Sequence, residues 1–431
     1  MTLQEVKKSI QEAIRKRDLI HEFSQENYAL LSKHFGTFEA ILTGRGEEKC
    51  LIPETGTAHF LYRGQNAEYG MCVPSIYRND PDDISIFENR MRLIAFHRLL
   101  YSHPVVKHFF LRHNFLVNEE GLAQHYGLQT EILDLTSSLD VALFFALCKY
   151  DPSTDSYDYF RDGTHTGVLY VFDPILDNEP TPAIHLNYMN GNIRPIGLQA
   201  FPRPGVQYGY GLRIGKGLST KSWIFTFEFT AEESKEYHDK FCNGNALWIK
   251  DRLADKTKEI AGQSMFSYSV FNETFAKFRP KGWSGSRLKR ALSSVSLTSR
   301  LPDILFSARE QREIVEEWND HLGRETASKI VRKHWFKHQS TEKGKNGEEY
   351  IRGIYNQMDF RTLPRINEHI LLNLIASPNG PEGAEWRNYT GLPRPVERPH
   401  PDDGGWKKVE GGLHTVYGKP YMTEKDWIIE L

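Results

Sequence analysis

The hydrophobic positions at the start of the chain follow the period of a helix. They recur every three to six residues, at Leu3, Val6, Ile10, Ile14 and Ile20. Thr2 stands three residues before Glu5, which is the spacing of a capping box. The pattern therefore predicts a helix over residues 2–35.

Three segments farther along have the pattern of strands. "VLYVF" at residues 168–172 is a continuous apolar run, which is typical of a buried strand. "SWIFTFEF" at residues 222–229 alternates between apolar and polar positions and predicts a half-buried strand. Residues 60–62 are apolar and aromatic, and the strand that they predict ends at Arg63 and Gly64.

Helical patterns alternate with these strands. They cover residues 85–118, the two halves of 119–147, and parts of 232–253 and 307–338. Helices and strands in this arrangement predict an α+β fold with helical additions at both ends.

The length of 431 residues exceeds what one ordinary hydrophobic core supports. We expect a helical segment at 1–50, the main α+β domain at 51–300 and a second helical segment at 301–375. Residues 376–431 are dense in proline, glycine and charge, so we expect them to wrap the surface as a tail.

The net charge of −2 argues against a protein that binds nucleic acid through its overall charge, although local basic patches remain compatible with it. The four cysteines are too few for a disulfide framework, and none forms a C-x-x-C motif. No apolar run is long enough to cross a membrane. We therefore expect a reduced, cytoplasmic protein without a membrane partner.

Arg63 and Gly64 follow a predicted buried strand, which would point the guanidinium into a cleft. Arginine binds phosphate or pyrophosphate bidentately, and glycine lets a ligand approach the backbone. Arg78, in "VPSIYR", would add a second positive charge. The alternative for both arginines is an ordinary structural or solvated role.

Residues 124–138 combine several polar side chains that packing alone does not explain. His125 is suited to acid–base catalysis or to orienting a ligand, but a single histidine in apolar surroundings is more often structural. Asp134 precedes the hydroxyls of Thr136, Ser137 and Ser138. Ser137 and Asp140 have capping-box spacing, and the same helix start would offer free N–H groups to an anion.

The turn-rich string "RPGVQYGYG" adds Arg203 and Gln207 as candidate substrate contacts. The Gln207 amide can orient a ligand but cannot act as a base. His334 and His338 would share one face of a predicted helix, but "HWFKH" lacks the glutamate of a zinc-protease motif, so we expect no metal.

Five strings taken together resemble the FRG domain family, which is named for a Phe-Arg-Gly-type motif. They are "FLYRGQ", "VPSIYR", "LAQHYGLQTEILDLTSSLDVALFFAL", "VLYVF" and "RPGVQYGYG", in the order that the family has. The resemblance covers about 58–211, and its long central string is the most specific part. "YRG" at 62–64 and "LTSSLDVALFFA" at 135–146 are also similar, more distantly, to strings of mono-ADP-ribosyltransferases.

The distant resemblance implies a split-sheet core and NAD as the substrate. Arg63 and Gly64 would hold the pyrophosphate or ribose, with His125 and Tyr126 at the ribose or against a ring. The hydroxyls of Thr136, Ser137 and Ser138 would brace the nicotinamide. The catalytic glutamate of those enzymes is matched by neutral Gln207, with Glu228 as a substitute on a later strand.

The resemblance implies that the ADP-ribosyl group of NAD is transferred to a protein, to a nucleic acid or to water, and that the chain acts as a toxin or phage-defence effector. One alternative is a non-catalytic module that recognises a nucleotide or nucleic acid and binds a protein partner. Another is a metal-independent nuclease that uses His125 with Arg63 and Arg203.

Overall fold

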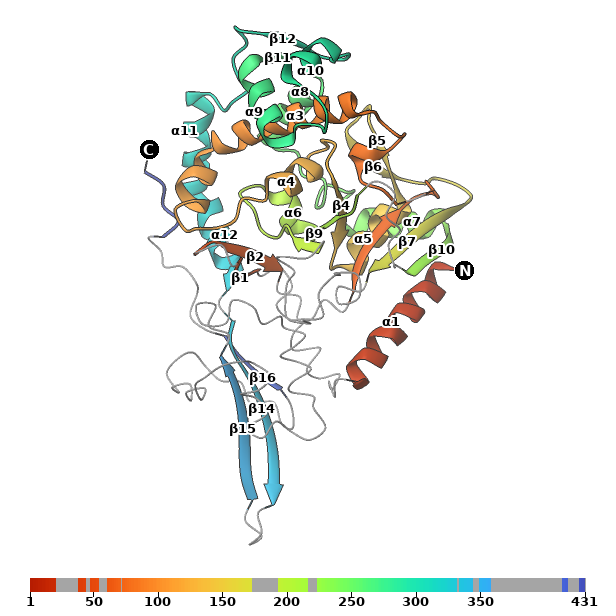
Figure 1. Cartoon of the computed structure of the whole chain (residues 1–431). Coiled ribbons are helices and arrows are strands. Elements are labelled where there is room, and N and C mark those ends of the chain that lie inside the picture. Colours follow the sequence, from red (N-terminus) through yellow and green to blue (C-terminus); the bar gives the residue numbers. More distant parts are fainter. Residues whose placement is uncertain are drawn as a thin grey trace.

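The computed structural model describes residues 1–20, 38–43, 47–53, 60–70, 72–172, 193–215, 223–331, 333–343, 349–357, 413–417 and 426–430. Within these residues, helices and a six-stranded antiparallel sheet form one α+β arrangement (Figure 1). The α+β class expected from the sequence is confirmed.

The central sheet has the strand order β10-β7-β3-β4-β9-β8, and every neighbouring pair is antiparallel. Its strands are β10 (Trp223–Thr230), β7 (Thr164–Phe172), β3 (Leu61–Gln65), β4 (Ile132–Thr136), β9 (Gly209–Arg213) and β8 (Ile193–Pro195). The strands β3 and β4 pair at one position, Tyr62 with Thr136. The two strands therefore diverge beside this pair, although one apolar cluster still joins β7 and β3 to β4, β9 and β8; this divergence is called the split below.

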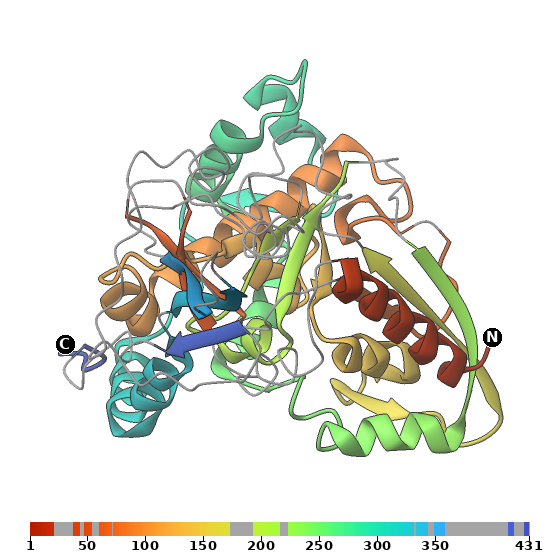
Figure 2. The same ribbon diagram turned by 90° about the horizontal axis from the view of Figure 1, so that it is seen from below.

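Three helices cover one face of the β10-β7-β3 half of the sheet. They are α1 (Leu3–Ile20), α5 (Leu139–Leu147) and α7 (Ala231–Lys240), and they share one apolar cluster with β3, β7 and β10. Figure 2 shows α1, drawn in red, lying alongside β10. Gly64 permits the contact between α5 and β3, because a Cβ atom there would lie 1.7 Å from the carbonyl oxygen of Ala142.

A second, larger core lies among the helices on the other side of the split. It includes side chains from α3 (Asp83–Tyr101), the π-helical turn η3 (Val106–Phe110), α4 (Glu119–His125), α8 (Arg252–Ala261), α9 (Tyr268–Phe278) and α11 (Ala308–Glu317). In Figure 1, α9 and α10 (Gly285–Ala291) form a lobe with β11 (Met265–Ser267) and β12 (Ser296–Thr298), next to α3.

The remaining strands form smaller sheets. These are β1 (Phe38–Leu42) with β2 (Lys49–Pro53) and β13 (Ile330–Val331); β5 (Cys148–Asp151) with β6 (Ser156–Tyr159); and β14 (Lys333–Lys343) with β15 (Glu349–Gln357) and β16 (Leu413–Tyr417). The β14–β15 hairpin points away from the helical lobe in Figure 1.

The structure corrects three local predictions. The helix expected at 85–118 ends at Tyr101, three residues before Pro104, which has no N–H group to continue it. The helical prediction at 307–338 is wrong beyond Lys329, because His334 and His338 lie on strand β14, which pairs in a hairpin with residues 349–357. The N-cap of α5 is Ser138 rather than Ser137.

The boundaries expected for the four segments stay a prediction. Residues 21–35 of the N-terminal helix and most of the 376–431 tail lie outside the described residues. None of the helices in the described ranges combines the length and the apolar character that crossing a membrane requires.

Candidate functional site

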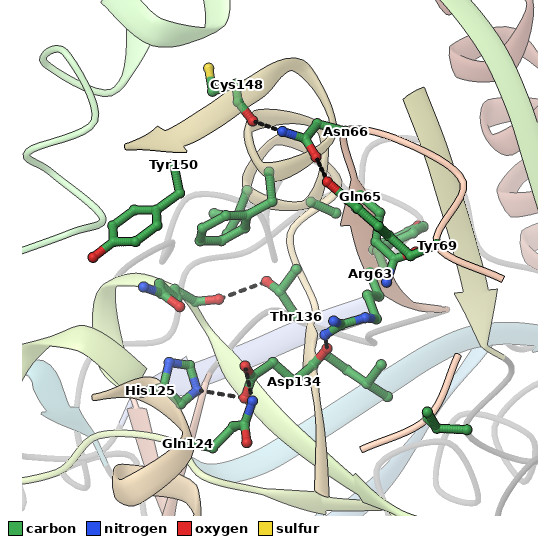
Figure 3. A pocket seen from close by; sticks show the side chains of 18 of the residues that line it. Arg63, Gln65, Asn66, Tyr69, Gln124, His125, Asp134, Thr136, Cys148 and Tyr150 are labelled. Carbon is green, nitrogen blue, oxygen red and sulfur yellow. Dashed lines mark hydrogen bonds and ion pairs between the residues drawn. The ribbon is translucent and has the colours of Figure 1, made fainter. Parts of the chain in front are cut away.

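A cavity of about 1000 Å³ opens where β3 and β4 separate. Residues 62–66 line it from β3 and the turn that follows, and residues 134–136 line it from β4. Figure 3 shows Arg63 and Tyr150 on opposite sides of this cavity, with His125 and Asp134 along its lower edge in that view. The split in the sheet thus becomes a pocket with polar and aromatic walls.

Two arginines line the cavity together. The Nη1 atom of Arg63 donates a hydrogen bond to the backbone oxygen of Asp134, 3.1 Å away, which spans the split from β3 to β4. Arg78 also lines the cavity, and its pKa is lowered, first by loss of water and then by the positive charge of Arg63. An anionic ligand would relieve the repulsion between these two side chains.

Asp134 supplies a carboxylate in the same cavity. Gln124 donates from Nε2 to Asp134 Oδ2 at 3.1 Å, while its own Oε1 accepts from Ser75 at 3.0 Å and from Thr130 at 2.5 Å. Because both ends of the amide are engaged, Gln124 holds the carboxylate in one orientation. The other oxygen, Oδ1, lies 3.8 Å from Nε2 of His125 (Figure 3).

His125 is almost fully buried at the end of α4. Burial lowers the pKa of its imidazole, and the nearby Asp134 carboxylate opposes that shift. Gly209 makes room for the ring, since a Cβ atom there would lie 2.8 Å from His125 Nε2. The Arg203 guanidinium donates to the His125 backbone oxygen at 3.3 Å and so supports the end of the helix.

An aromatic wall lines the same cavity, and one of its rings, Tyr150, lies opposite Arg63 (Figure 3). Its rings belong to Phe145, Tyr150, Tyr157 and Trp248, and the centroids of the last three lie 5.4–5.5 Å from one another. Asp155 fixes two of the rings, accepting from Tyr150 Oη at 2.6 Å and from Trp248 Nε1 at 3.0 Å. Such a wall offers flat apolar faces on which a heterocyclic base could stack.

Thr136 and Gln207 line the cavity, but their polar groups are engaged by the protein itself. Thr136 Oγ1 donates to the Gln207 backbone oxygen at 2.7 Å and accepts from the Ser138 N–H at 3.0 Å. Gln207 Nε2 donates to the Leu247 backbone oxygen at 2.9 Å. Thr136 therefore joins β4 to the end of α6 (Pro202–Val206), and Gln207 joins that end to Leu247.

Five of the residues singled out from the sequence do not line this cavity: Tyr126, Ser137, Ser138, Arg203 and Glu228. Tyr126 donates to Asp251 at 2.5 Å, and Ser138 caps α5. Arg203 is buried between the rings of Tyr126 and Trp248, at 4.5 and 4.1 Å. Glu228 is exposed on the edge strand β10, where alternation turns its side chain outward.

The sequence did not predict a chemical role for Asp134 or for the aromatic wall. Asp134 could have been identified from the sequence, because it is the one acidic residue in the otherwise largely apolar strand "ILDLT". Tyr150, Tyr157 and Trp248 gave no comparable signal, since they come from a polar loop region and from a turn almost a hundred residues later. Across the described ranges, no three His, Cys, Asp or Glu side chains are grouped to hold a metal ion.

The family model of the FRG domain matches residues 58–155. The chain contains an FRG domain. No curated protein and no solved structure was found to match the chain. Arg63, Arg78, His125, Asp134 and Tyr150 all fall inside the matched FRG residues, whereas Gln207 and Trp248 reach the cavity from outside them. The FRG domain thus supplies most, but not all, of the cavity.

Proposed function

We propose that the FRG domain binds a nucleotide in the cavity between β3 and β4, with NAD as the first candidate. The main support for this proposal comes from four buried polar atoms in the lining of the cavity: Arg63 Nε, Gln65 Oε1, His125 Nε2 and Asp134 Oδ1. None has a hydrogen-bond partner among the described residues. An unsatisfied buried polar group costs about 1–3 kcal/mol, so a polar ligand would stabilise this arrangement.

The walls of the cavity suit the parts of a nucleotide. Arg63 and Arg78 would bind phosphate oxygens, for which guanidinium groups are well shaped. Tyr150 and Trp248 would stack on a base. The unpaired atoms of His125 and Asp134 would bind ribose hydroxyls, one as donor and one as acceptor.

We further propose that Asp134 supplies the negative charge for ADP-ribose transfer or hydrolysis. In this reaction the bond from ribose C1′ to the nicotinamide nitrogen breaks, and neutral nicotinamide leaves with the electron pair. An acceptor or water oxygen bonds to C1′ and releases its proton to solvent. A fixed carboxylate would stabilise the positive charge that develops on the ribose. Asp134 would replace Glu228, which is remote, and Gln207, which is neutral.

Calorimetry with NAD, ADP-ribose and AMP tests the binding, and chromatography of NAD and nicotinamide tests the turnover. Wild-type protein should bind at least one of these ligands. Arg63→Ala should weaken that binding, whereas Arg161→Ala, which changes an exposed arginine outside the cavity, should not. Failure of the wild type to bind any of the three would refute a nucleotide site.

A non-catalytic recognition module is the second candidate. It is favoured by Gln207, a neutral residue at the position that matches the catalytic glutamate of the ADP-ribosyltransferases. The Gln207 side-chain amide donates a hydrogen bond to the Leu247 backbone oxygen. Nucleotide binding without release of nicotinamide under any acceptor condition would select it. The nuclease hypothesis has no such support, because Arg203 does not share the cavity with His125 and Arg63.

A toxic or phage-defence role would follow if turnover depletes NAD in a cell. Expression in a bacterial host should then arrest growth and lower cellular NAD, and Arg63→Ala should prevent both. Normal growth and normal NAD with soluble wild-type protein would contradict an effector role without affecting nucleotide binding itself.

A further inference from the structure

One segment of the helical lobe is strongly basic. Between Glu273 and Asp303 the chain has no acidic residue and seven basic ones: Lys277, Arg279, Lys281, Arg287, Lys289, Arg290 and Arg300. The whole chain sums to −2, so all the other residues together carry −9. Charge is therefore segregated, and the near-zero total hides a local excess of +7 on residues 277–300, here named the basic segment.

Little in the described structure neutralises this charge. All seven residues are exposed. The two acids that bracket the basic segment, Glu273 and Asp303, both bind Arg98, at 2.6 and 3.1 Å. Lys277 lies 3.8 Å from Glu119, but the other six basic side chains form no ion pair with any described residue.

Aromatic rings lie among these charges. The Arg287 guanidinium lies 4.5 Å from the centre of the Trp283 ring, and Arg279 Nε donates to the Trp283 backbone oxygen at 2.8 Å. Lys289 lies 5.0 Å from the ring of Tyr268, which is 43% exposed. Leu288 is fully buried and anchors α10, so the basic side chains are presented from a fixed support.

We propose that the basic segment binds single-stranded nucleic acid. Lysine and arginine neutralise backbone phosphates, and partly exposed rings stack on unpaired bases, which together make a sequence-tolerant surface. Paired bases in a duplex would leave Trp283 and Tyr268 without stacking partners, which is why a single strand fits better. This surface is separate from the nucleotide cavity and does not depend on the ligand that the cavity takes.

Arg90 connects the basic segment to the residue that precedes β4. Its side chain donates from Nη1 to the Phe278 backbone oxygen at 3.4 Å and pairs with Glu131 at 2.5 Å. Glu131 directly precedes β4, the strand that carries Asp134. The basic segment is therefore joined, through Arg90 and Glu131, to the start of the strand that carries the cavity residue Asp134.

Fluorescence anisotropy with labelled single-stranded RNA, single-stranded DNA and duplex DNA, over a range of salt concentrations, tests this surface. Wild-type protein should bind single strands more tightly than duplex. The triple variant Arg287→Glu, Lys289→Glu and Arg290→Glu should lose at least tenfold in affinity. Each lost phosphate contact lowers the slope of log affinity against log salt by about 0.7 for single strands, so the slope should fall by about 2.

A matched triple variant, Arg309→Glu, Arg312→Glu and Arg324→Glu, makes the same charge change at exposed positions of α11 and α12 (Gly323–Lys329). It should retain most of the affinity and the slope. If the first triple variant does not fold, Lys281→Glu with Arg300→Glu alters only positions outside helices and strands and should lower the slope by about 1.4.

Two results would overturn the assignment. One is the absence of salt-dependent binding of either single strand, including the case in which the protein binds only vesicles that contain phosphatidylserine. The other is an equal loss of oligonucleotide affinity in both triple variants. The first triple variant should also bind NAD as the wild type does. Loss of oligonucleotide binding with NAD binding intact would separate this surface from the proposed nucleotide site.

Discussion

Nε2 of His125 and Oδ1 of Asp134 face each other across 3.8 Å, and neither atom has a hydrogen-bond partner among the described residues. This distance is too long for a direct hydrogen bond. Burial lowers the pKa of the His125 imidazole, and the Asp134 carboxylate opposes that shift. A ligand hydroxyl beside both atoms would satisfy both, and we therefore expect the pair to engage the ribose.

Asp134→Asn should separate binding from chemistry. The asparagine oxygen can still accept from Gln124, so the side chain keeps its orientation, but the negative charge is lost. If Asp134 stabilises a cationic transition state, the rate of nicotinamide release should fall at least about 100-fold, with a much smaller change in the NAD dissociation constant. Chromatography and calorimetry on the same preparation measure the two quantities.

Two controls accompany this variant. Asp239→Asn changes an exposed carboxylate on α7 and should leave the rate unchanged. Glu228→Gln tests the carboxylate that the sequence had favoured. If the rate collapses in Glu228→Gln but not in Asp134→Asn, the role assigned to Asp134 is wrong.

Tyr150→Ala should weaken the binding of ligands that contain a base. Removing the ring takes away one stacking face, which is worth about 1–3 kcal/mol, so the dissociation constant for AMP should rise about tenfold. Tyr150→Phe keeps the ring and loses only the hydrogen bond to Asp155, so its affinity should stay close to that of the wild type. Calorimetry with AMP measures both effects.

Ribose 5-phosphate provides the internal control, because it has no base to stack. Its affinity should be the same in wild type and Tyr150→Ala. An equal loss for AMP and ribose 5-phosphate would show that Tyr150 shapes the cavity generally rather than stacking on a base.

The local fold was predictable where the pattern of side chains decides the structure. Apolar residues of α1 recur at helical spacing, and the alternation in β10 places Phe227 and Phe229 inside and Glu228 outside. The pattern failed at residues 333–343, which form a strand through pairing with residues 349–357. β15 begins only six residues after β14 ends, so the two strands form a hairpin, and the helical spacing of His334 and His338 does not reveal that pairing.

The candidate site was predictable only in part, for a similar reason. Arg63 and His125 stood out because glycine-bounded polar residues interrupt apolar strings. Trp248 did not, because it reaches the cavity through ring contacts with Tyr150 and Tyr157 and a hydrogen bond to Asp155. Arg203 was expected at a ligand, but tertiary packing buries it behind Trp248 instead.

Gly64→Ala should destabilise the fold. Its added Cβ would lie 1.7 Å from the Ala142 backbone oxygen, so α5 would have to move away from β3. We expect the free energy of unfolding to fall by at least about 3 kcal/mol, measured by urea denaturation. Gly262→Ala is the matched control, because its nearest contact is 3.5 Å and its φ of −81° suits alanine. A strain-free Gly-to-Ala change stabilises a protein by about 0.4–1 kcal/mol, so a gain of that size, or a loss below about 1 kcal/mol, in Gly64→Ala would contradict the tight packing.

His103→Phe should reduce the loss of stability in mild acid. The imidazole is buried between the rings of Phe201 and Phe306, at 4.6 and 4.9 Å. Burial, followed by the positive charge of Arg252, lowers its pKa from 6.5 to about 3. Between these two values the unfolded chain binds a proton that the folded chain does not bind. Stability therefore falls as the pH falls below 6.5, by up to about 1.4 kcal/mol per pH unit for this one group.

Urea denaturation at pH 7, 6, 5 and 4 gives the pH dependence directly. Phenylalanine fits an aromatic neighbourhood and cannot take up a proton, so the slope of unfolding free energy against pH should decrease by about one proton in His103→Phe. The exposed His321→Phe serves as the control and should leave the slope unchanged. An unaltered slope in His103→Phe would mean that the folded protein protonates His103 as readily as the unfolded chain does, and that the ring is not sealed from water between Phe201 and Phe306.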